Sequence, residues 1–541
     1  MKKLPVGIQS IEEIIRDGYI YVDKTQFAKK LITEGKYYFL SRPRRFGKSL
    51  FLNTLEEILS GNKELFKECQ IYESDYDWQI YPVIFFDFSL IANRDPIEFK
   101  ESLKRKLQNI GTEYGLSITA PTVQEGLEAL VVGLSKENNR VVILIDEYDQ
   151  PIINNLKHLE IAEQNRDLLK DFFGTIKGLD KYLKFTFFTG VSKFSQVSLF
   201  SGPNNLTDIT MDPEYGEMMG YTEEEVKQSF NKHIQSITKE RNLLGKKTSE
   251  REILDEIRQW YNGYRFSERE SSVYNPYSTL RFLAQGKTES YWYSTGTPSF
   301  LIDQVKKHPQ AAIPLSGTTT LKSTLSDISK LDRINLAALM FQTGYLTIKN
   351  YNPEEDSYSL DFPNQEVRQA FFNSLLQEFT EINPLEVSRT SEEIKKDLEN
   401  FDLESFVNKI NVHFAKIAYQ LFSGSNEGFY QAVFFTFLEK SGIVTRAEVA
   451  TNIGRIDLIC EMPKAIYIFE LKLDKTADIA FKQAEAKKYR EMYSHDGKDI
   501  LVMGVNFSSK TRNIGSWRGI VFSSSHQLTR EILPIKENYN L

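Results

Sequence analysis

The sequence predicts an α/β protein, with a parallel sheet in its N-terminal part and a second α/β domain at its C-terminal end. Three observations support this fold class. Continuous apolar runs at 82–88, 141–145 and 184–189 alternate with helical stretches, as expected of strands buried on both faces of a parallel sheet. From about residue 215 the pattern becomes mostly helical. Beyond about residue 394, helices, three strands, a helix and a strand follow one another.

The composition and net charge of the chain argue against several classes of protein. A net charge of −7 argues against a general basic coat for nucleic acid, although a local basic groove is compatible with it. The two cysteines, Cys69 and Cys460, lie far apart, so the sequence predicts neither a disulfide framework nor a cysteine zinc site. The sequence shows no signal-peptide apolar region and no run near the roughly 18 residues that span a bilayer. We therefore expect a cytoplasmic protein without membrane association.

The first site lies between a predicted strand at 36–40 and a predicted helix at 49–59. A loop in this position can cradle phosphates with its backbone N–H groups, while Lys48 reaches the β and γ phosphates and Ser49 holds Mg²⁺. The sequence thus predicts an ATP-binding P-loop. Arg42 stands where glycine is usual in such loops, and a basic surface loop that caps the helix is the alternative. The candidate nucleotide-binding loop residues are Arg42, Pro43, Arg44, Arg45, Phe46, Gly47, Lys48 and Ser49.

Two acidic residues follow the strand at 141–145. An apolar strand that ends in Asp and then Glu can hold Mg²⁺ through Asp146 and activate the attacking water through Glu147. The alternative is an exposed acidic strand end. The strand at 184–189 would place Thr189, with Ser192 and Lys193, near the γ phosphate, where a sensing role and ordinary loop polarity both remain open. For Arg44 and Arg45, phosphate neutralisation and simple solvation also remain open.

The C-terminal block predicts helices at 405–421 and 428–440, strands at 446–451, 455–460 and 465–471, a helix at 477–493 and a strand at 500–507. If the second and third strands form a hairpin, Asp457 approaches Glu470, and both carboxylates can bind Mg²⁺ or Mn²⁺. Strand alternation puts Lys472 on the face of Glu470, where it can orient or deprotonate water and stabilise charge at phosphorus.

Glu427, on the preceding helix, is a candidate further acidic residue of this site, and Gln483 on the following helix is a candidate substrate or metal-site contact. The pattern predicts metal-assisted phosphodiester hydrolysis. An edge hairpin with ordinary surface charges is the alternative. A nuclease fold that has lost catalysis is another, and the presence of Asp457, Glu470 and Lys472 together argues against it.

Six motifs follow one another along the first part of the chain: Tyr21–Thr25, Arg42–Ser49, Leu144–Asp149, Thr189–Ser192, Leu199–Gly202 and Asn205–Asp208. In this order they resemble the bacterial AAA-ATPase-like family, which is often fused to a PD-(D/E)XK nuclease-superfamily domain. In that family the arginine-rich loop is the usual form, and the resemblance implies an ATPase sheet with an additional strand. The C-terminal order of Glu, Asp, Glu-x-Lys and Gln resembles the nuclease superfamily over about residues 424–510, which implies a restriction-endonuclease-like fold. The chemistry of Asp23 and Lys24 in the first motif does not follow from the sequence.

We expect an AAA-ATPase-like P-loop domain at 1–215, a helical or winged-helix-like middle region at 216–393 and a nuclease-like domain at 394–541. The leading hypothesis is an ATPase that controls a metal-dependent nuclease, with DNA favoured over RNA and with phage defence, mobile-element control or repair as roles that suit such a fusion. A second hypothesis is an ATP-driven switch whose C-terminal domain binds nucleic acid without cutting it. A small-molecule kinase is disfavoured because the Asp146–Glu147 pair suits water activation. A homo-oligomeric ring is one option, although no arginine that would reach a neighbour's γ phosphate is recognisable.

Overall fold

The structure, a computed structural model of the chain, divides into two compact units. Unit 1 comprises residues 1–297 and 319–367, and unit 2 comprises residues 298–318 and 368–541. The motif Leu199–Gly202 and the first residue of the next motif, Asn205, lie outside the described residues, as do 418–421 of the helix predicted at 405–421. The described residues are 1–135, 139–193, 206–293, 301, 318–326, 335–379, 384–417, 422, 426–451, 453–493, 496–525 and 527–534.

Unit 1 contains a parallel five-stranded sheet in the order β2-β3-β4-β1-β5. Strand β4 lies between β1 and β3, which confirms the additional strand between the phosphate-loop strand and the Asp-Glu strand. The buried side chains of β1, β3 and β4 explain the continuous apolar runs of the sequence. The strands are β1 (Tyr37–Ser41), β2 (Val83–Asp87), β3 (Val141–Asp146), β4 (Leu183–Gly190) and β5 (Thr207–Asp208).

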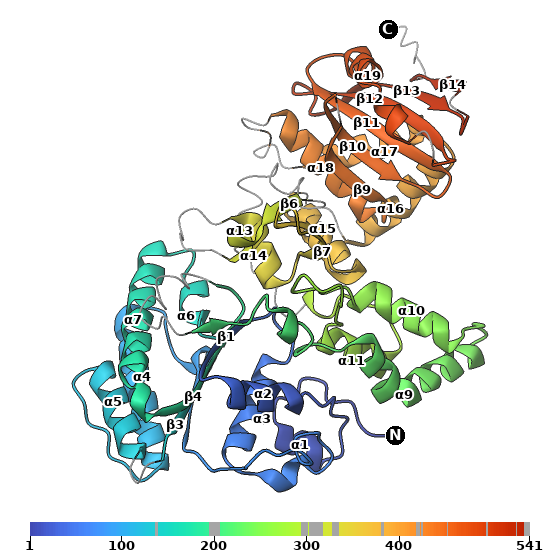
Figure 1. Cartoon of the computed structure of the whole chain (residues 1–541). Coiled ribbons are helices and arrows are strands. Elements are labelled where there is room, and N and C mark those ends of the chain that lie inside the picture. The colour runs from blue at the N-terminus through green and yellow to red at the C-terminus, as the bar shows by residue number, and fades with distance from the viewer. Residues whose placement is uncertain are drawn as a thin grey trace. The chain divides into compact units, whose positions relative to one another are not determined.

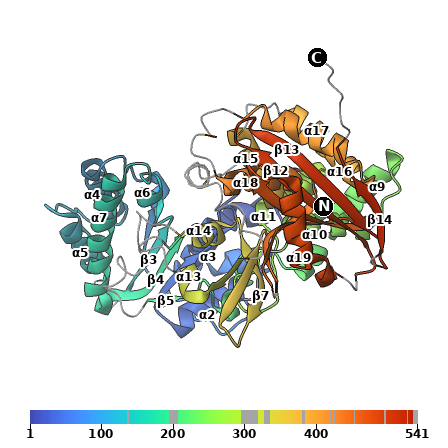
Figure 2. The same ribbon diagram turned by 90° about the horizontal axis from the view of Figure 1, so that it is seen from above.

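Helices cover both faces of this sheet, as Figures 1 and 2 show together. Helices α2 (Thr25–Glu34) and α3 (Lys48–Leu59) lie on one side, and α4 (Pro96–Glu113), α5 (Val123–Leu134) and α7 (Leu159–Gly178) on the other. Asp95 and Thr122 cap α4 and α5 through their side chains. The short helices α1 (Ile11–Arg16) and α6 (Gln150–Ile153) complete this part.

The middle of the chain begins with three helices that share one apolar core: α9 (Glu223–Leu243), α10 (Glu250–Tyr261) and α11 (Pro276–Gln285). Thr222 caps α9, since its hydroxyl accepts from the backbone N–H of Glu225 while the Glu225 carboxylate accepts from that of Thr222. Ser249 and Glu252 form the same capping box on α10.

A small three-stranded sheet follows in the order β6-β8-β7. Along the chain come β6 (Thr318–Leu321), α13 (Lys322–Ser326), α14 (Leu336–Thr343), β7 (Thr347–Asn352) and β8 (Ser357–Asp361). The middle region therefore contains a small sheet in addition to its helices.

Unit 2 is built on a six-stranded mixed sheet in the order β14-β13-β12-β11-β10-β9. Strands β10 and β11 form the predicted antiparallel hairpin, and β11 pairs in parallel with β12. Two further antiparallel strands, β13 and β14, were not predicted. The strands are β9 (Val444–Ala450), β10 (Arg455–Glu461), β11 (Ala465–Leu473), β12 (Asp499–Ser508), β13 (Asn513–Phe522) and β14 (Leu528–Ile532).

Side-chain alternation on β11 sends apolar residues to two helical layers. Ile466 and Ile468 join the core beneath α19 (Ala477–Ala486). Phe469 packs against Phe406 of α17 (Leu403–Phe414) and Phe434 of α18 (Glu427–Lys440). Helices α15 (Gln365–Phe379) and α16 (Pro384–Glu399) precede them.

Helix α19 is shorter than the helix predicted at 477–493. It ends at Ala486, Lys488 adopts a positive φ of 50°, and a 3-10 turn spans Tyr489–Tyr493. The apolar pattern continues through this break because Tyr489 and Tyr493 are still buried, which is why periodicity alone suggested one long helix. Among the residues that the structure describes, none of the helices has the length and apolar character needed to cross a membrane.

Candidate nucleotide and nuclease sites

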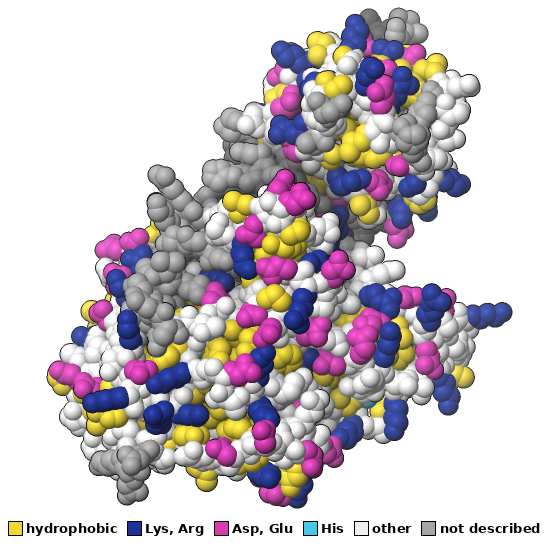
Figure 3. Space-filling model, viewed as in Figure 1, with side chains coloured by type: hydrophobic (Ala, Val, Ile, Leu, Met, Phe, Trp, Pro, Cys, Tyr) yellow, Lys and Arg dark blue, Asp and Glu magenta, His cyan; other side chains and the backbone are white. Residues whose placement is uncertain are grey.

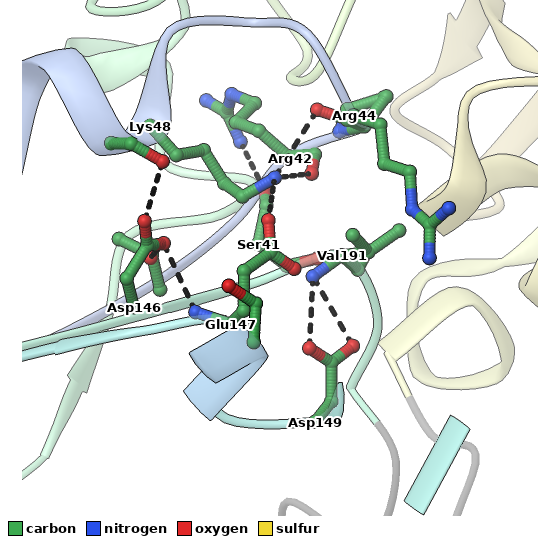
Figure 4. A network of polar contacts seen from close by, with 12 residues as sticks. Ser41, Arg42, Arg44, Lys48, Asp146, Glu147, Asp149 and Val191 are labelled. Carbon is green, nitrogen blue, oxygen red and sulfur yellow. Dashed lines mark hydrogen bonds and ion pairs between the residues drawn. The ribbon is translucent and has the colours of Figure 1, made fainter. Parts of the chain in front are cut away.

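The phosphate loop connects the end of β1 to the start of α3. Gly47, at φ 89°, is the residue just before α3, a left-handed conformation that glycine adopts without strain. The side chain of Lys48 is 4% exposed and points back over the loop. Its Nζ donates to the carbonyl oxygen of Arg42 at 3.2 Å and lies 3.3 Å from Oε1 of Glu147 (Figure 4). The lysine thus stands where it can exchange these oxygens for phosphate oxygens.

Asp146 and Ser49 meet at the carboxyl end of the sheet. The Ser49 hydroxyl donates to Oδ2 of Asp146 at 2.5 Å, and the Thr189 hydroxyl donates to Oδ1 at 2.5 Å. Burial, followed by the nearby charge of Glu147, raises the pKa of Asp146. A serine hydroxyl and a carboxylate in contact are the hard oxygen donors that Mg²⁺ prefers, so these two residues fit the ion.

Glu147 combines an unusual backbone with an unsatisfied carboxylate. Its φ is 50°, in the left-handed region that non-glycine residues rarely occupy. Oε1 faces Lys48, and Oε2 is buried and makes no hydrogen bond to the described residues. A carboxylate with a free oxygen at the pocket wall can accept a proton from water.

The residues after β4 are anchored by a carboxylate that the sequence reasoning left without a role. Asp149 is fully buried and accepts from the backbone N–H groups of Val191 and Ser192 and from the Ser192 hydroxyl, the last at 2.6 Å. Burial and then the charge of Glu147 raise the pKa of Asp149 to about 6. Lys193 pairs with Asp208 at 2.5 Å. Thr189 therefore positions Asp146 from behind the pocket, and Ser192 and Lys193 are engaged with other side chains.

Arg42 lies under the loop. Its side chain is 0% exposed and donates to the carbonyl oxygens of Ser41, Thr210 and Tyr215, and its guanidinium lies 4.1 Å from the centroid of the Phe266 ring. Phe46 is also buried, against Tyr264 and Phe266. Among the described residues, Arg42, Pro43 and Phe46 do not line the pocket. Their side chains anchor the loop, which also explains why an arginine can stand at the usual glycine position.

The pocket around Lys48 has a volume of about 400 Å³. Its phosphate end is formed by the loop with Asp146 and Glu147, and Arg44 and Arg45 also line it. Its other walls come from far along the chain and were not predicted, although Asp87 stands at the end of a buried strand, which was a usable signal. These lining residues are Pro5, Gly7, Ile8, Gln9, Asp87, Ser89, Gln150, Tyr221, Pro276, Tyr277 and Leu280.

The middle region touches the phosphate loop directly within unit 1. The Trp292 indole N–H donates to the carbonyl oxygen of Arg44 at 3.0 Å. The Arg45 guanidinium lies 5.0 Å from the Tyr277 ring centroid, a cation–π distance. The Arg44 side chain points away from Lys48 in Figure 4. Both arginines are therefore placed where the loop meets the middle region.

The second site forms where β10 and β11 pair. Oδ2 of Asp457 accepts from the backbone N–H of Leu471 at 2.7 Å and lies 3.9 Å from Nζ of Lys472. The same Nζ lies 3.1 Å from Oε1 of Glu470. Glu470 is 0% exposed, and its Oε2 makes no hydrogen bond to the described residues. The structure thus brings together the three residues that the strand pattern predicted.

The electrostatics of this site suit a cation. Burial and then the charge of Asp457 raise the pKa of Glu470 to about 7, and burial raises that of Asp457 to about 6. Although burial opposes its charge, the Glu470 and Asp457 carboxylates raise the pKa of Lys472. Lys472 is thus a charged group at neutral pH, and such a group can stabilise negative charge nearby. The unpartnered Oε2 of Glu470 is a ready ligand for a divalent ion.

Around this core, the structure describes no cluster of three or more His, Cys, Asp or Glu side chains arranged to hold a metal. A cation bound by Asp457 and Glu470 would therefore complete its shell with carbonyl, water or phosphate oxygens. Glu427 lies at the start of α18, where its Oε2 accepts from the Leu473 N–H at 2.9 Å. The Gln483 side chain, on α19, forms no hydrogen bond with the described residues of the site. Sequence reasoning missed Glu448, which accepts from Gln431 at 2.9 Å and whose charge acts on Asp457.

Comparison with known proteins identifies two domain families in the chain. The family model described as "Predicted AAA-ATPase" matches residues 5–200, and that of the PD-(D/E)XK nuclease superfamily matches residues 425–517. An "Uncharacterized protein in vnfD 5'region" of Azotobacter chroococcum mcd 1 is 35% identical over 524 residues, which are 95% of this chain and 98% of that protein.

Solved structures match only weakly. The Aeropyrum pernix ORC1 protein in complex with DNA has 12% identity and a TM-score of 0.24 over 68% of this chain and 96% of that chain. The Aeropyrum pernix ORC2 protein has 10% identity and a TM-score of 0.26 over 65% of this chain and 93% of that chain. These values are too low to support an inference about the chain.

The two domain matches imply the use of a nucleotide and a divalent metal. They coincide with the two places where the structure gathers charged residues, the phosphate loop after β1 and the β10–β11 hairpin. With its full-length relative, the chain therefore belongs to the AAA-ATPase-like family, and it carries a C-terminal domain of the PD-(D/E)XK nuclease superfamily.

Proposed function

We propose that this protein binds and hydrolyses ATP and thereby controls a Mg²⁺-dependent nuclease site in its C-terminal domain. The observation that carries the proposal is the convergence of Asp457, Glu470 and Lys472 in a chain that also holds a complete phosphate-loop site. DNA is the proposed substrate in preference to RNA. Phage or mobile-element defence is the role that we propose for such a pair of activities, and it rests on the domain combination alone.

At the nucleotide site, Lys48 would exchange its contacts with Arg42 and Glu147 for the β and γ phosphates. Ser49 and Asp146 would hold Mg²⁺, which neutralises phosphate charge when bound. Loss of the Lys48 contact frees Glu147 to accept a proton from the attacking water. Tyr221, Tyr277 and Leu280 offer apolar surface for the base at the other end of the pocket.

At the nuclease site, Asp457 and Glu470 would hold the divalent ion, which supplies an activated water and polarises the phosphate when bound. Lys472, charged and 3.1 Å from Glu470, would stabilise negative charge that develops on the phosphate. The water oxygen would bond to phosphorus and lose a proton to solvent or a neighbouring oxygen. The bond from phosphorus to the departing sugar oxygen would break, and that oxygen would take a proton from solvent and leave as a hydroxyl.

The middle region is the proposed receiver of the nucleotide signal. Nucleotide that fills the pocket would contact Tyr277 and the loop, and the loop is hydrogen-bonded to Trp292. Binding would therefore favour one arrangement of the middle region over others, which is what control of a second site requires.

The test is an assay of phosphate release and cleavage in the same reactions, with plasmid DNA, single-stranded DNA and RNA, Mg²⁺ or Mn²⁺, and with or without ATP. Lys48→Ala is expected to lower phosphate release by about 100-fold or more, with exposed Lys63→Ala as control. Asp457→Asn is expected to abolish cleavage, with exposed Asp496→Asn as control.

Cleavage that survives Asp457→Asn would contradict the assigned site. Phosphate release without cleavage of any substrate would favour the alternative, an ATP-driven switch that binds nucleic acid without cutting it. A change in cleavage on adding ATP to the wild type, absent in Lys48→Ala, is expected if ATP controls the nuclease.

A further inference from the structure

Lys487 is a half-buried lysine whose side chain lies against Gly454, the residue before β10. It follows the last residue of α19, and its backbone N–H caps that helix by donating to the carbonyl oxygen of Gln483. Its ammonium lies 5.9 Å from the Tyr489 ring centroid. Within the part of the chain that the structure describes, no carboxylate pairs with it. Its neighbour Lys488, in contrast, is exposed and pairs with Glu491 at 3.3 Å.

Gly454 creates the space that the Lys487 side chain occupies. A methyl group at Gly454 would lie 2.8 Å from both Nζ and Cδ of Lys487, closer than real contacts allow. Gly454 stands immediately before β10, three residues ahead of Asp457. The ammonium therefore lies against the start of the strand that carries a proposed metal ligand.

The carboxylates of the nuclease site have other cations to balance their charge. Lys472 already lies between Glu470 and Asp457, and a bound cation would neutralise the same two carboxylates. Among the residues that the structure describes, no anion is then left to pair with the positive charge of Lys487.

A half-buried ammonium without an anion is unfavourable unless a ligand completes it. A lysine is a mobile point charge that suits a phosphate oxygen. Over the described surface in Figure 3, Lys and Arg are interspersed with Asp and Glu, in keeping with the net charge of −7. Binding of a polyanion therefore depends on local cations at the site more than on a general field.

We propose that Lys487 binds a backbone phosphate of the nucleic acid next to the cleaved bond and that Gly454 keeps its path open. The proposal rests on the nuclease function proposed above. It makes Lys487 a substrate-binding residue, separate from Lys472, which acts at the reacting phosphate.

The test measures binding of a labelled DNA duplex to the full chain in Ca²⁺, over a range of salt, and cleavage in Mg²⁺. Lys487→Gln is expected to weaken binding by about 10-fold and to lower the slope of log K against log salt by about 1, because one phosphate contact is lost. Lys488→Gln is the matched control and should leave both values unchanged. Lys487→Arg should restore much of the binding.

Gly454→Ala is expected to reproduce the loss with the lysine retained, and the melting temperatures of all variants verify folding. Equal affinity and salt slope for Lys487→Gln and Lys488→Gln would overturn the proposal, as would a wild type that does not bind the duplex. If the wild type binds DNA through Lys487 but never cuts it, the nuclease function fails while the phosphate contact stands.

Discussion

At the scale of single residues, burial sets the chemistry of Glu366 more than any charge partner does. Its side chain is 0% exposed, and its Oε1 accepts from the Ser278 hydroxyl at 3.0 Å and from the Trp292 backbone N–H at 2.7 Å. Its Oε2 has no hydrogen bond among the described residues. Burial raises the pKa of Glu366 to about 8, so the carboxyl is mostly protonated at neutral pH.

This carboxyl predicts a pH-dependent stability. Its pKa is about 8 when folded and 4.5 without the protein environment, so the folded state holds the proton more tightly. The free energy of unfolding therefore falls as pH rises from about 4.5 to about 8 and is fully reduced above that range. Glu366→Gln, which cannot ionise, is expected to raise the melting temperature at pH 9 by several degrees relative to the wild type and to have little effect at pH 5.

The check is thermal unfolding at pH 5, 7 and 9, with exposed Glu354→Gln as control. A wild type and a Glu366→Gln variant with parallel pH profiles would show that the carboxyl is charged in the folded protein.

At the scale of elements, the Asp23-Lys24-Thr25 motif joins the start of α2 to other segments. Asp23 accepts from the backbone N–H of Gln70 at 2.7 Å and from that of Thr25 at 2.9 Å. Lys24 is 8% exposed and pairs with Glu225, the capping-box residue of α9, at 2.6 Å. Burial lowers the pKa of Lys24, and the Glu225 carboxylate opposes that effect. The motif thus has a structural role that its sequence did not reveal.

Breaking this buried pair should destabilise unit 1. Lys24→Met leaves Glu225 without its charge partner and is expected to cost about 3 kcal/mol. Lys227→Met removes an exposed lysine from Glu223, which keeps its pair with Arg258, and should cost less than about 1 kcal/mol. Urea unfolding of both variants, of Glu225→Gln and of Lys24→Met/Glu225→Gln measures the coupling between Lys24 and Glu225. If Lys24→Met and Lys227→Met lower the free energy of unfolding equally, the Lys24–Glu225 pair stabilises the fold no more than an exposed lysine does.

At the scale of the whole molecule, each compact unit holds one charged site. The phosphate loop, the pocket and the parts of the middle region at 216–297 and 319–367 belong to unit 1, and Asp457, Glu470 and Lys472 belong to unit 2. For ATP to control the nuclease, some element of the chain must take part in both activities. Binding of ATP must then change the free energy of that element's conformations.

Glu147→Gln tests that coupling. The variant keeps Lys48 and the Mg²⁺ residues, so we expect ATP binding near the wild-type level with hydrolysis lowered by about 100-fold. With ATP added, the variant should cleave DNA at a constant rate that differs from its rate without ATP. The wild-type rate should return to the ATP-free value as ATP is consumed. Time courses of plasmid cleavage with and without an ATP-regenerating system measure this. Cleavage by Glu147→Gln that is the same with and without ATP would argue against control by the bound nucleotide.

The sequence by itself determined the parts whose signals are local. The buried strands, the loop before α3, the Asp146-Glu147 strand end and the Glu470-x-Lys472 pair all follow from residues adjacent in the chain, because strand alternation and loop position place neighbours in known directions. The β10–β11 hairpin was also within reach, since its two strands are separated by a short turn.

Only the tertiary structure decided the rest. Arg42 belongs under the loop because Thr210, Tyr215 and Phe266 receive it there, and Thr189 faces Asp146 instead of the pocket. The contact of Trp292 with Arg44 spans 248 residues. No local pattern marks such pairs, because the cost of closing a chain loop rises only slowly with its length, and many distant partners are therefore nearly equivalent until the whole core is packed.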